Sequence, residues 1–246
     1  MEISILYLAI LFAASLVTSL ISAVSGMGGG IVLLAVMTFF FSPTSLIPIH
    51  GLIQLISNSS RAWYLKKHIH VPLFLWFLLG LPFGTLLAIA ILARFEVANL
   101  ITVLLLILIL YTVFRPKNLP ELKIPIWSFS LVGFFVGLFG PLIGSTGPMM
   151  APFFLRDDLN RKQIVASKAS VQLIGHLIKI PTFLYLGFSY VDYSISTGVM
   201  IGGVLIGTHY GVKLLDGLKE NTFRWLFRIA LLGAALRLSY QLVFAS

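Results

Sequence analysis

The chain has 246 residues, of which 59% are hydrophobic and only 10% are charged. Soluble domains carry about 25% charged residues, so this composition excludes a soluble globular protein and indicates an integral membrane protein embedded in the lipid bilayer. The net charge is +9, but basic residues in membrane proteins mark cytoplasmic loops, so we expect no nucleic-acid partner. The absence of cysteine excludes disulfides and thiolate chemistry, and we expect neither a metal nor a cofactor.

Hydropathy predicts ten hydrophobic segments, five on each side of a polar linker at 116–124. In the first half, residues 1–115, they lie at about 4–25, 30–41, 48–65, 72–93 and 97–114, and Ser42-Pro43 ends the second. In the second half, residues 125–246, they lie at about 125–143, 148–155, 163–186, 192–214 and 222–244. Because a spanning helix needs about 20 residues, we predict that 30–41 and 148–155 are half-helices paired with the segments before them.

Basic residues gather in the loops that follow the odd-numbered segments. They are Lys66, Lys67, Arg115, Lys117, Lys123, Arg156, Arg161, Lys162, Lys213 and Lys219. The positive-inside rule places these loops, including the linker, in the cytoplasm and both termini outside. The second half is then upside down relative to the first. We therefore predict an all-α polytopic membrane protein of two inverted five-segment repeats, each with a glycine-broken helix pair. The alternative is eight spans in parallel repeats, which scatters the basic residues over both sides.

Glycine interrupts the apolar sequence at corresponding places in the two halves. The first cluster comprises Gly26, Gly28, Gly29 and Gly30, and the second comprises Gly144, Ser145, Thr146 and Gly147 before Pro148. Glycine costs about 1 kcal/mol relative to alanine inside a helix, so both clusters predict helix breaks. A helix that starts at such a break directs bare N–H groups and its positive dipole end at one point, which suits an anion. Close helix packing through small residues is the alternative interpretation.

Polar residues form one helical face in each half. They are His50, Gln54, Asn58 and Arg61 in the third segment, and Lys168, Gln172, His176 and Lys179 in the eighth. The spacing is four, four and three in both sets, and the offset between the sets is 118 residues at every position, which supports a repeat. Polar residues at membrane depth usually face a cavity or pathway. Arg61 and Lys168 also lie near segment ends, where their side chains can extend to the membrane interface, and the two glutamines can instead join helices by hydrogen bonds.

The carboxylates all fall at segment ends or in loops. They are Glu2, Glu96, Glu121, Asp157, Asp158, Asp192, Asp216 and Glu220. The residues predicted at depth are cationic, neutral or histidine, which favours an anionic cargo. If protons are coupled to transport, His50 or His176 is the expected carrier, because histidine titrates near physiological pH. Glycines in the ninth segment, Gly198, Gly202, Gly203 and Gly207, predict close packing against a neighbouring helix.

The two glycine clusters also carry a family resemblance. Gly26-Met27-Gly28-Gly29-Gly30, and the weaker Gly144-Ser145-Thr146-Gly147-Pro148-Met149-Met150-Ala151-Pro152, resemble the paired glycine motifs of the sulfite exporter TauE/SafE family, also described as toluenesulfonate-uptake permeases. The resemblance extends over nearly the whole chain. It departs from the family pattern at Ala35, where a proline is usual, and at Ser145 and Thr146, where more glycine is usual. It implies transport of a small sulfur-containing anion, such as sulfite or an organosulfonate, across the bacterial inner membrane.

These observations together predict a secondary transporter, not an enzyme, that works by alternating access. The candidate substrate-binding residues are Gly26, Gly28, Gly29, Gly30, Gln54, Asn58, Gly144, Ser145, Thr146, Gly147, Lys168, Gln172, His176 and Lys179. A proton or a sodium ion is the candidate coupling ion. An intramembrane hydrolase that uses His50 or His176, and a passive anion channel, are the alternative functions.

Overall fold

The protein is described by a computed structural model that covers residues 4–25, 28–95, 98–114, 124–154 and 156–214, with single positions at 232, 236, 239 and 240. Every regular element in this part of the chain is helical. The α-helices are α1 (Ile5–Ser25), α2 (Gly29–Met37), α3 (Pro43–Tyr64), α4 (Val71–Arg94), α5 (Ala98–Phe114), α6 (Phe129–Ile143), α7 (Gly147–Phe154), α8 (Arg161–Leu177), α9 (Lys179–Tyr185) and α10 (Ser194–Lys213). Three single 3-10 turns precede α4, α6 and α10, at Lys66–His68, Ile126–Ser128 and Val191–Tyr193.

The all-helical prediction is confirmed, and several helix boundaries differ from the sequence prediction. Helix α2 ends at Met37 and not at 41, and α6 begins at Phe129 and not at 125, after a 3-10 turn. Helix α3 begins at Pro43, ahead of the predicted start at 48, because Ser42 caps it by accepting a hydrogen bond from the Ser45 N–H and Pro43 suits the first turn. The predicted segment 163–186 is two helices separated at Ile178. Pro181 lacks an N–H for the carbonyl of Leu177, which accounts for the break. The predicted segment 222–244 and linker residues 116–123 lie outside the described residues, apart from four isolated positions.

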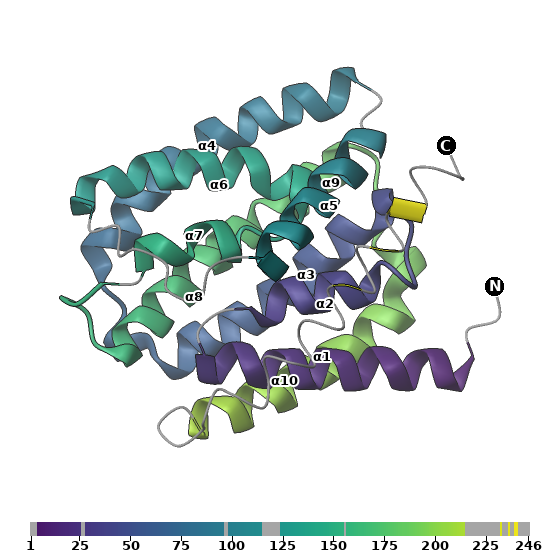
Figure 1. Ribbon diagram of the computed structural model, residues 1–246, viewed down its shortest axis with the longest axis horizontal. Coiled ribbons are helices and arrows are strands. Elements are labelled where there is room, and N and C mark those ends of the chain that lie inside the picture. Colours follow the sequence, from purple (N-terminus) through teal and green to yellow (C-terminus); the bar gives the residue numbers. More distant parts are fainter. Residues whose placement is uncertain are drawn as a thin grey trace.

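Two long helix pairs enclose the shorter helices (Figure 1). Helices α4 and α6 form one pair and α1 and α10 form the other, and these are the two most extensive contacts between helices. Helices α3 and α8 also contact one another, and Figure 1 places them with α2 and α7 between the two pairs. The polar helices therefore lie inside the molecule.

Glycine permits the close approach within both outer pairs. A Cβ at Gly84 of α4 would overlap the backbone carbonyl of Phe134 in α6, and a Cβ at Gly133 of α6 would overlap that of Phe77 in α4. In α10, Gly207 meets the carbonyl of Leu16 in α1 in the same way. Small residues let membrane helices bring their backbones together, and dispersion contacts then stabilise the pair.

The expected packing role of the ninth-segment glycines is right for half of them. Gly203 and Gly207 lie against the backbone of α1, and Gly202 makes an ordinary contact with the same helix, where an added Cβ would lie 3.8 Å from a Phe12 ring atom. Among the described residues, Gly198 has no atom within 4 Å of an added Cβ. Close packing is therefore confirmed for Gly203 and Gly207, and the described residues show no neighbour packed on Gly198.

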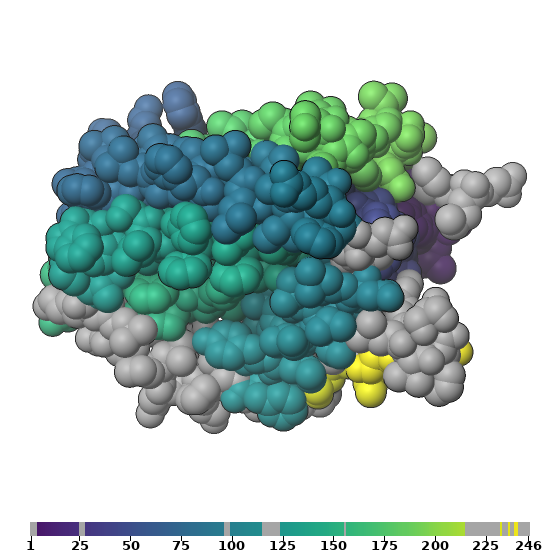
Figure 2. All heavy atoms as spheres, turned by 90° about the horizontal axis from the view of Figure 1, so that it is seen from above, coloured from purple at the N-terminus to yellow at the C-terminus, as the bar shows by residue number. Residues whose placement is uncertain are grey.

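The outer surface is apolar. Figure 2 shows one face, much of which is formed by α4, α5 and α6. On these helices Phe83 is 67% exposed, Leu86 65% and Leu131 57%. Within the described residues, four helical stretches are long and apolar enough to cross a membrane: Ile5–Val24, Val71–Arg94, Ile126–Ile143 and Val191–Lys213. A folded chain with apolar residues outside and polar helices inside is a multi-pass membrane protein.

The loop between α7 and α8 is fixed by an ion pair. Arg156 donates to both carboxylate oxygens of Asp158, at 2.8 and 2.7 Å, and to the carbonyl of Ile124 at 2.7 Å. The hydrogen bonds to Asp158 raise the pKa of the Arg156 guanidinium above its usual value. The two parallel hydrogen bonds to Asp158 fix the Arg156 side chain, and its third hydrogen bond joins this loop to Ile124, which lies before the 3-10 turn that leads into α6.

Candidate functional site: a cationic pocket between two helix breaks

The break between α1 and α2 depends on glycine. Gly28 precedes α2 with φ 93° and ψ −37°, a conformation that L side chains rarely adopt. A Cβ at Gly29 would overlap the backbone carbonyl of Thr18 in α1, so α2 starts in direct contact with the helix before it. The last of these glycines, Gly30, lies in the first turn of α2. The predicted site residue Gly26 lies outside the described residues.

The break between α6 and α7 offers fewer backbone N–H donors than the sequence predicted. Gly144 turns the chain with φ 73°, and the N–H of Ser145 donates to the carbonyl of Ile143 at 2.8 Å. Pro148 has no N–H. The Ser145 backbone is therefore already used within the turn, and the first turn of α7 presents fewer free N–H groups than that of α2.

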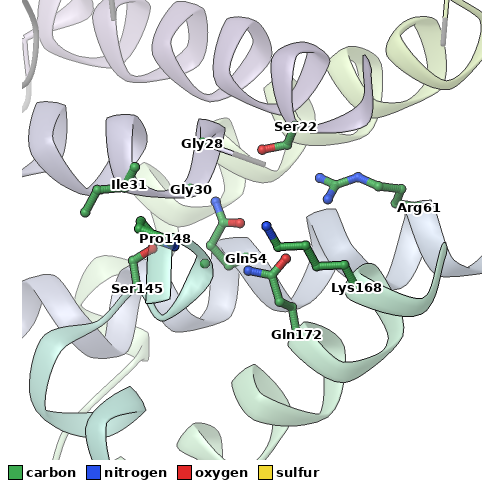
Figure 3. Close-up of a pocket in the computed structure, with 11 residues that line it drawn as sticks. Ser22, Gly28, Gly30, Ile31, Gln54, Arg61, Ser145, Pro148, Lys168 and Gln172 are labelled. Atoms are coloured by element: carbon green, nitrogen blue, oxygen red, sulfur yellow. The ribbon is translucent and has the colours of Figure 1, made fainter. Parts of the chain in front are cut away.

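Residues from both breaks line one pocket, together with side chains of α3 and α8. The lining residues are Ser22, Gly28, Gly30, Ile31, Gln54, Arg61, Ser145, Gly147, Pro148, Lys168 and Gln172. In the close-up, Gln54 and Arg61 extend from α3 and Lys168 and Gln172 from α8, and their polar ends point into the space beside the starts of the half-helices (Figure 3). The pocket therefore combines the two helix breaks with the polar faces predicted for the third and eighth segments.

Two buried cations lie at this pocket. Arg61 is 2% exposed and Lys168 1%. Arg61 donates to Asn58 Oδ1 at 3.3 Å and to Ser57 Oγ at 3.2 Å, while its Nε is buried and has no hydrogen-bond partner in the described part of the chain. The described residues that line the pocket include no carboxylate. A buried charge is costly unless it is compensated, so an anion in the pocket would be strongly favoured.

The two glutamines, which belong to α3 and α8, pack against corresponding positions of the two half-helices. A Cβ at Gly30 in α2 would lie 3.1 Å from Gln54 Oε1, and one at Gly147 in α7 would lie 3.1 Å from Gln172 Nε2. Each amide therefore packs against the first turn of a half-helix. Side-chain amides supply both donors and acceptors, so they can bind an anion directly or orient its water.

The predicted site residues fall into two groups. Those that line the pocket are Gly28, Gly30, Gln54, Ser145, Gly147, Lys168 and Gln172. Those outside its lining are Gly29, Asn58, Gly144, Thr146, His176 and Lys179. Asn58 supports the pocket from behind, since its Nδ2 donates to the carbonyl of Gln54 at 2.8 Å and its Oδ1 accepts from Arg61.

His50, His176 and Lys179 form a separate buried cluster. The two imidazole rings lie 5.9 Å apart at 73°. His50 Nε2 is 2.8 Å from the carbonyl of Gly30, and Lys179 Nζ donates to the carbonyl of Gly144 at 2.6 Å. In the described part of the chain we find no group of three or more His, Cys, Asp and Glu residues that could hold a metal.

Sequence reasoning gave too little weight to Arg61 and missed Ser22, Ile31 and Pro148. Arg61 shares the polar helical face of Gln54, and this spacing was the signal that it belongs with the pocket. Its place near the end of α3 suggested that it extends to the membrane interface, but it is buried. Ser22 lies on α1 and enters the pocket through tertiary packing, for which the sequence offers no local signal.

We expect Gly144→Ala to destabilise the protein by about 1–3 kcal/mol, because a non-glycine residue is strained at a φ of 73°. The added methyl group would also lie 3.2 Å from Leu34 Cδ1. Gly175→Ala in α8 is the matched control, since its Cβ would make an ordinary 3.4 Å contact with Val136. Thermal unfolding in detergent measures both variants, and equal melting temperatures would contradict the strain assigned to Gly144.

The sequence comparisons agree with the resemblance found in the glycine clusters. The sequence model of the sulfite exporter TauE/SafE family matches residues 11–238. The chain belongs to this family. A relative described as a "Probable membrane transporter protein", from Haemophilus influenzae (strain ATCC 51907 / DSM 11121 / KW20 / Rd), is 27% identical over 230 residues, which is 87% of this chain and 88% of the relative. No solved structure matches. This TauE/SafE protein is therefore a membrane transporter, with its cationic pocket among the inner helices.

Proposed function

We propose that this protein is a secondary transporter that carries a small sulfur-containing anion, such as sulfite or an organosulfonate, across the bacterial inner membrane. The observation that carries the proposal is the pocket in which Arg61 and Lys168 are buried beside the starts of α2 and α7, with no carboxylate among the described residues of its lining. Helix starts and buried cations both favour negative charge. An oxyanion with several oxygen acceptors can accept hydrogen bonds from both cations and from the amides of Gln54 and Gln172.

Alternating access between two inverted repeats is the mechanism that we infer. It is supported by two reciprocal contacts between the halves of the chain, in which α1 packs on α10 and α6 packs on α4. Residues 1–115 and 125–246 would then be the repeats, with the first segment of each repeat packed on the fourth segment of the other. Rocking one repeat against the other would open the pocket to either side in turn. Both termini would lie outside, with a proton, carried by His50 or His176, or a sodium ion as the coupling ion.

The geometry of the histidines favours transport over hydrolysis. His50 Nε2 is hydrogen-bonded to the Gly30 carbonyl, and His176 Nδ1 is buried and has no hydrogen-bond partner within the described ranges. Among the described residues, neither imidazole is hydrogen-bonded to a serine or threonine hydroxyl, which a nucleophile–base pair requires.

A thermal-shift screen of the purified protein tests the cargo. Sulfite, sulfate, thiosulfate, sulfoacetate and simple carboxylates are compared with chloride at equal ionic strength. A ligand at 100 times its Kd stabilises the folded state by about 2.7 kcal/mol. We expect the sulfur oxyanions to raise the melting temperature and to be transported into proteoliposomes with saturable flux. No shift with any sulfur anion would refute the proposed cargo, and non-saturating flux would indicate a channel.

A further inference from the structure

Lys179 lies directly behind the wall of the pocket. It begins α9, immediately after the helix break at Ile178, and its side chain is buried. Its Nζ donates at 2.6 Å to the carbonyl of Gly144, and the next residue in the chain, Ser145, lines the pocket. The α6–α7 turn therefore separates Lys179 from the cations Arg61 and Lys168.

Glycine makes room for the Lys179 side chain on two helices. Its Cδ would lie 3.3 Å from a Cβ at Gly51 in α3, and its Cε would lie 3.3 Å from a Cβ at Gly140 in α6. A larger residue at either position would press on the aliphatic stem. The Lys179 side chain therefore lies between α3 and α6, where glycine at both contact positions leaves space for it.

The partner of Lys179 is weak for a buried ammonium. An ammonium has three donors, and among the described residues the structure gives Nζ one hydrogen bond, to the neutral carbonyl of Gly144. No carboxylate in the described residues forms a salt bridge with Lys179. A buried charge held by one neutral acceptor is poorly compensated, so an anion that reached Nζ would displace the carbonyl.

His50 and His176 lie with Lys179 in the buried cluster described above. His50 bonds to the carbonyl of Gly30, which lines the pocket, and the Nδ1 atom of His176 is buried with no hydrogen-bond partner among the described residues. The cluster of His50, His176 and Lys179 therefore contacts a backbone carbonyl at each helix break, Gly30 at the first and Gly144 at the second.

We propose that Lys179 is a second anion-binding residue, which takes the cargo from Arg61 and Lys168 by exchanging its hydrogen bond to Gly144 for one to the anion. The inference rests on the proposed function and adds an order of events to it. Release of the Gly144 carbonyl frees the α6–α7 turn, so arrival of cargo at Lys179 is coupled to movement of the half-helix. The first site captures the anion and the second permits its passage.

Binding and flux, measured separately with sulfite as the probe, test this handover. Lys179→Met retains the length of the side chain without its charge. We expect it to keep sulfite-dependent thermal stabilisation, with a Kd within about threefold of wild type, and to lose about tenfold or more of the flux into proteoliposomes. Lys179→Arg should recover part of the flux. Melting temperatures without sulfite show whether each variant is folded.

The outcomes separate this inference from the proposed function. Wild-type flux in Lys179→Met would overturn the handover, and so would a loss of sulfite binding as large as that in Arg61→Gln. Absence of sulfite binding and flux in the wild-type protein would instead overturn the proposed function, and the handover with it.

Cysteine labelling gives a second readout, because the natural chain has no cysteine. Thr182 lies one helical turn after Lys179 and is 2% exposed, so Thr182→Cys reports on access to the buried cluster. We expect slow reaction with a water-soluble maleimide, accelerated several-fold by a sulfonate that stabilises the protein in the thermal-shift screen but not by chloride. Sulfite is not used here because it adds to maleimides and consumes the reagent. Thr44→Cys, at an exposed position in α3, is the control that should label at one rate throughout. A rate at position 182 that does not change with the sulfonate would contradict the exchange.

Discussion

Arg61→Gln and Lys168→Gln are each expected to weaken sulfite binding about tenfold or more, because a charge-assisted hydrogen bond contributes about 1.5–3 kcal/mol. Both side chains are buried at the pocket, so their charges act on a bound anion with little screening by solvent. Titration of the melting temperature with sulfite measures the effect, and flux into proteoliposomes should fall in parallel. The double variant should show no sulfite-dependent stabilisation.

Exposed cations provide matched controls for these variants. Arg94→Gln at the end of α4 and Lys213→Gln at the end of α10 remove the same charge from the surface. If binding depended only on the net charge of +9, the surface and pocket variants would behave alike. Unchanged sulfite binding in Arg61→Gln and Lys168→Gln would remove the pocket as the binding site.

Gly207→Ala is expected to destabilise the fold by about 1–3 kcal/mol, the usual cost of an extra methyl group in a packed interior. Its Cβ would overlap the backbone carbonyl of Leu16, and a carbonyl cannot move aside as a flexible side chain can. Gly84→Ala should behave in the same way against Phe134. Thermal unfolding in detergent and the yield of monodisperse protein measure both variants.

Gly198→Ala in the same helix is the control. No atom of the described residues lies within 4 Å of the added methyl group, and alanine is favoured over glycine inside a helix by about 1 kcal/mol. We expect an unchanged or raised melting temperature. If Gly198→Ala and Gly207→Ala were equally tolerated, the close contact between α1 and α10 would not be important for stability.

The positions of the helices followed from patterns along the chain. Apolar runs located α1, α4 and α5 to within about two residues, because a membrane helix must satisfy its backbone hydrogen bonds internally. The start of α3 was misplaced because Ser42-Pro43 was interpreted as the end of α2, although a serine before a proline is also a helix N-cap signal. The α8–α9 break was missed although Pro181 was visible in the sequence.

The grouping of the polar residues could be predicted only in part. The spacing of Gln54, Lys168 and Gln172 placed them on helical faces, and the structure brings these faces together at one pocket. The 11-residue spacing places Lys168 and Lys179 about 16 Å apart along the chain's helical rise, but it could not show which of them lines the pocket. That assignment depends on packing of helices that are distant in sequence: in the α6–α7 turn, Ser145 lines the pocket, whereas the Gly144 carbonyl accepts the hydrogen bond of Lys179.

The contact between α1 and α10 has a consequence for biosynthesis. The face of α1 at Leu16 that receives Gly207 is made early, whereas α10 emerges from the ribosome only after all the other described α-helices. Contacts between residues far apart in sequence cannot form until both partners exist. The first helix must therefore wait in the bilayer, covered by lipid or by the insertion machinery, until nearly the whole polypeptide has been translated.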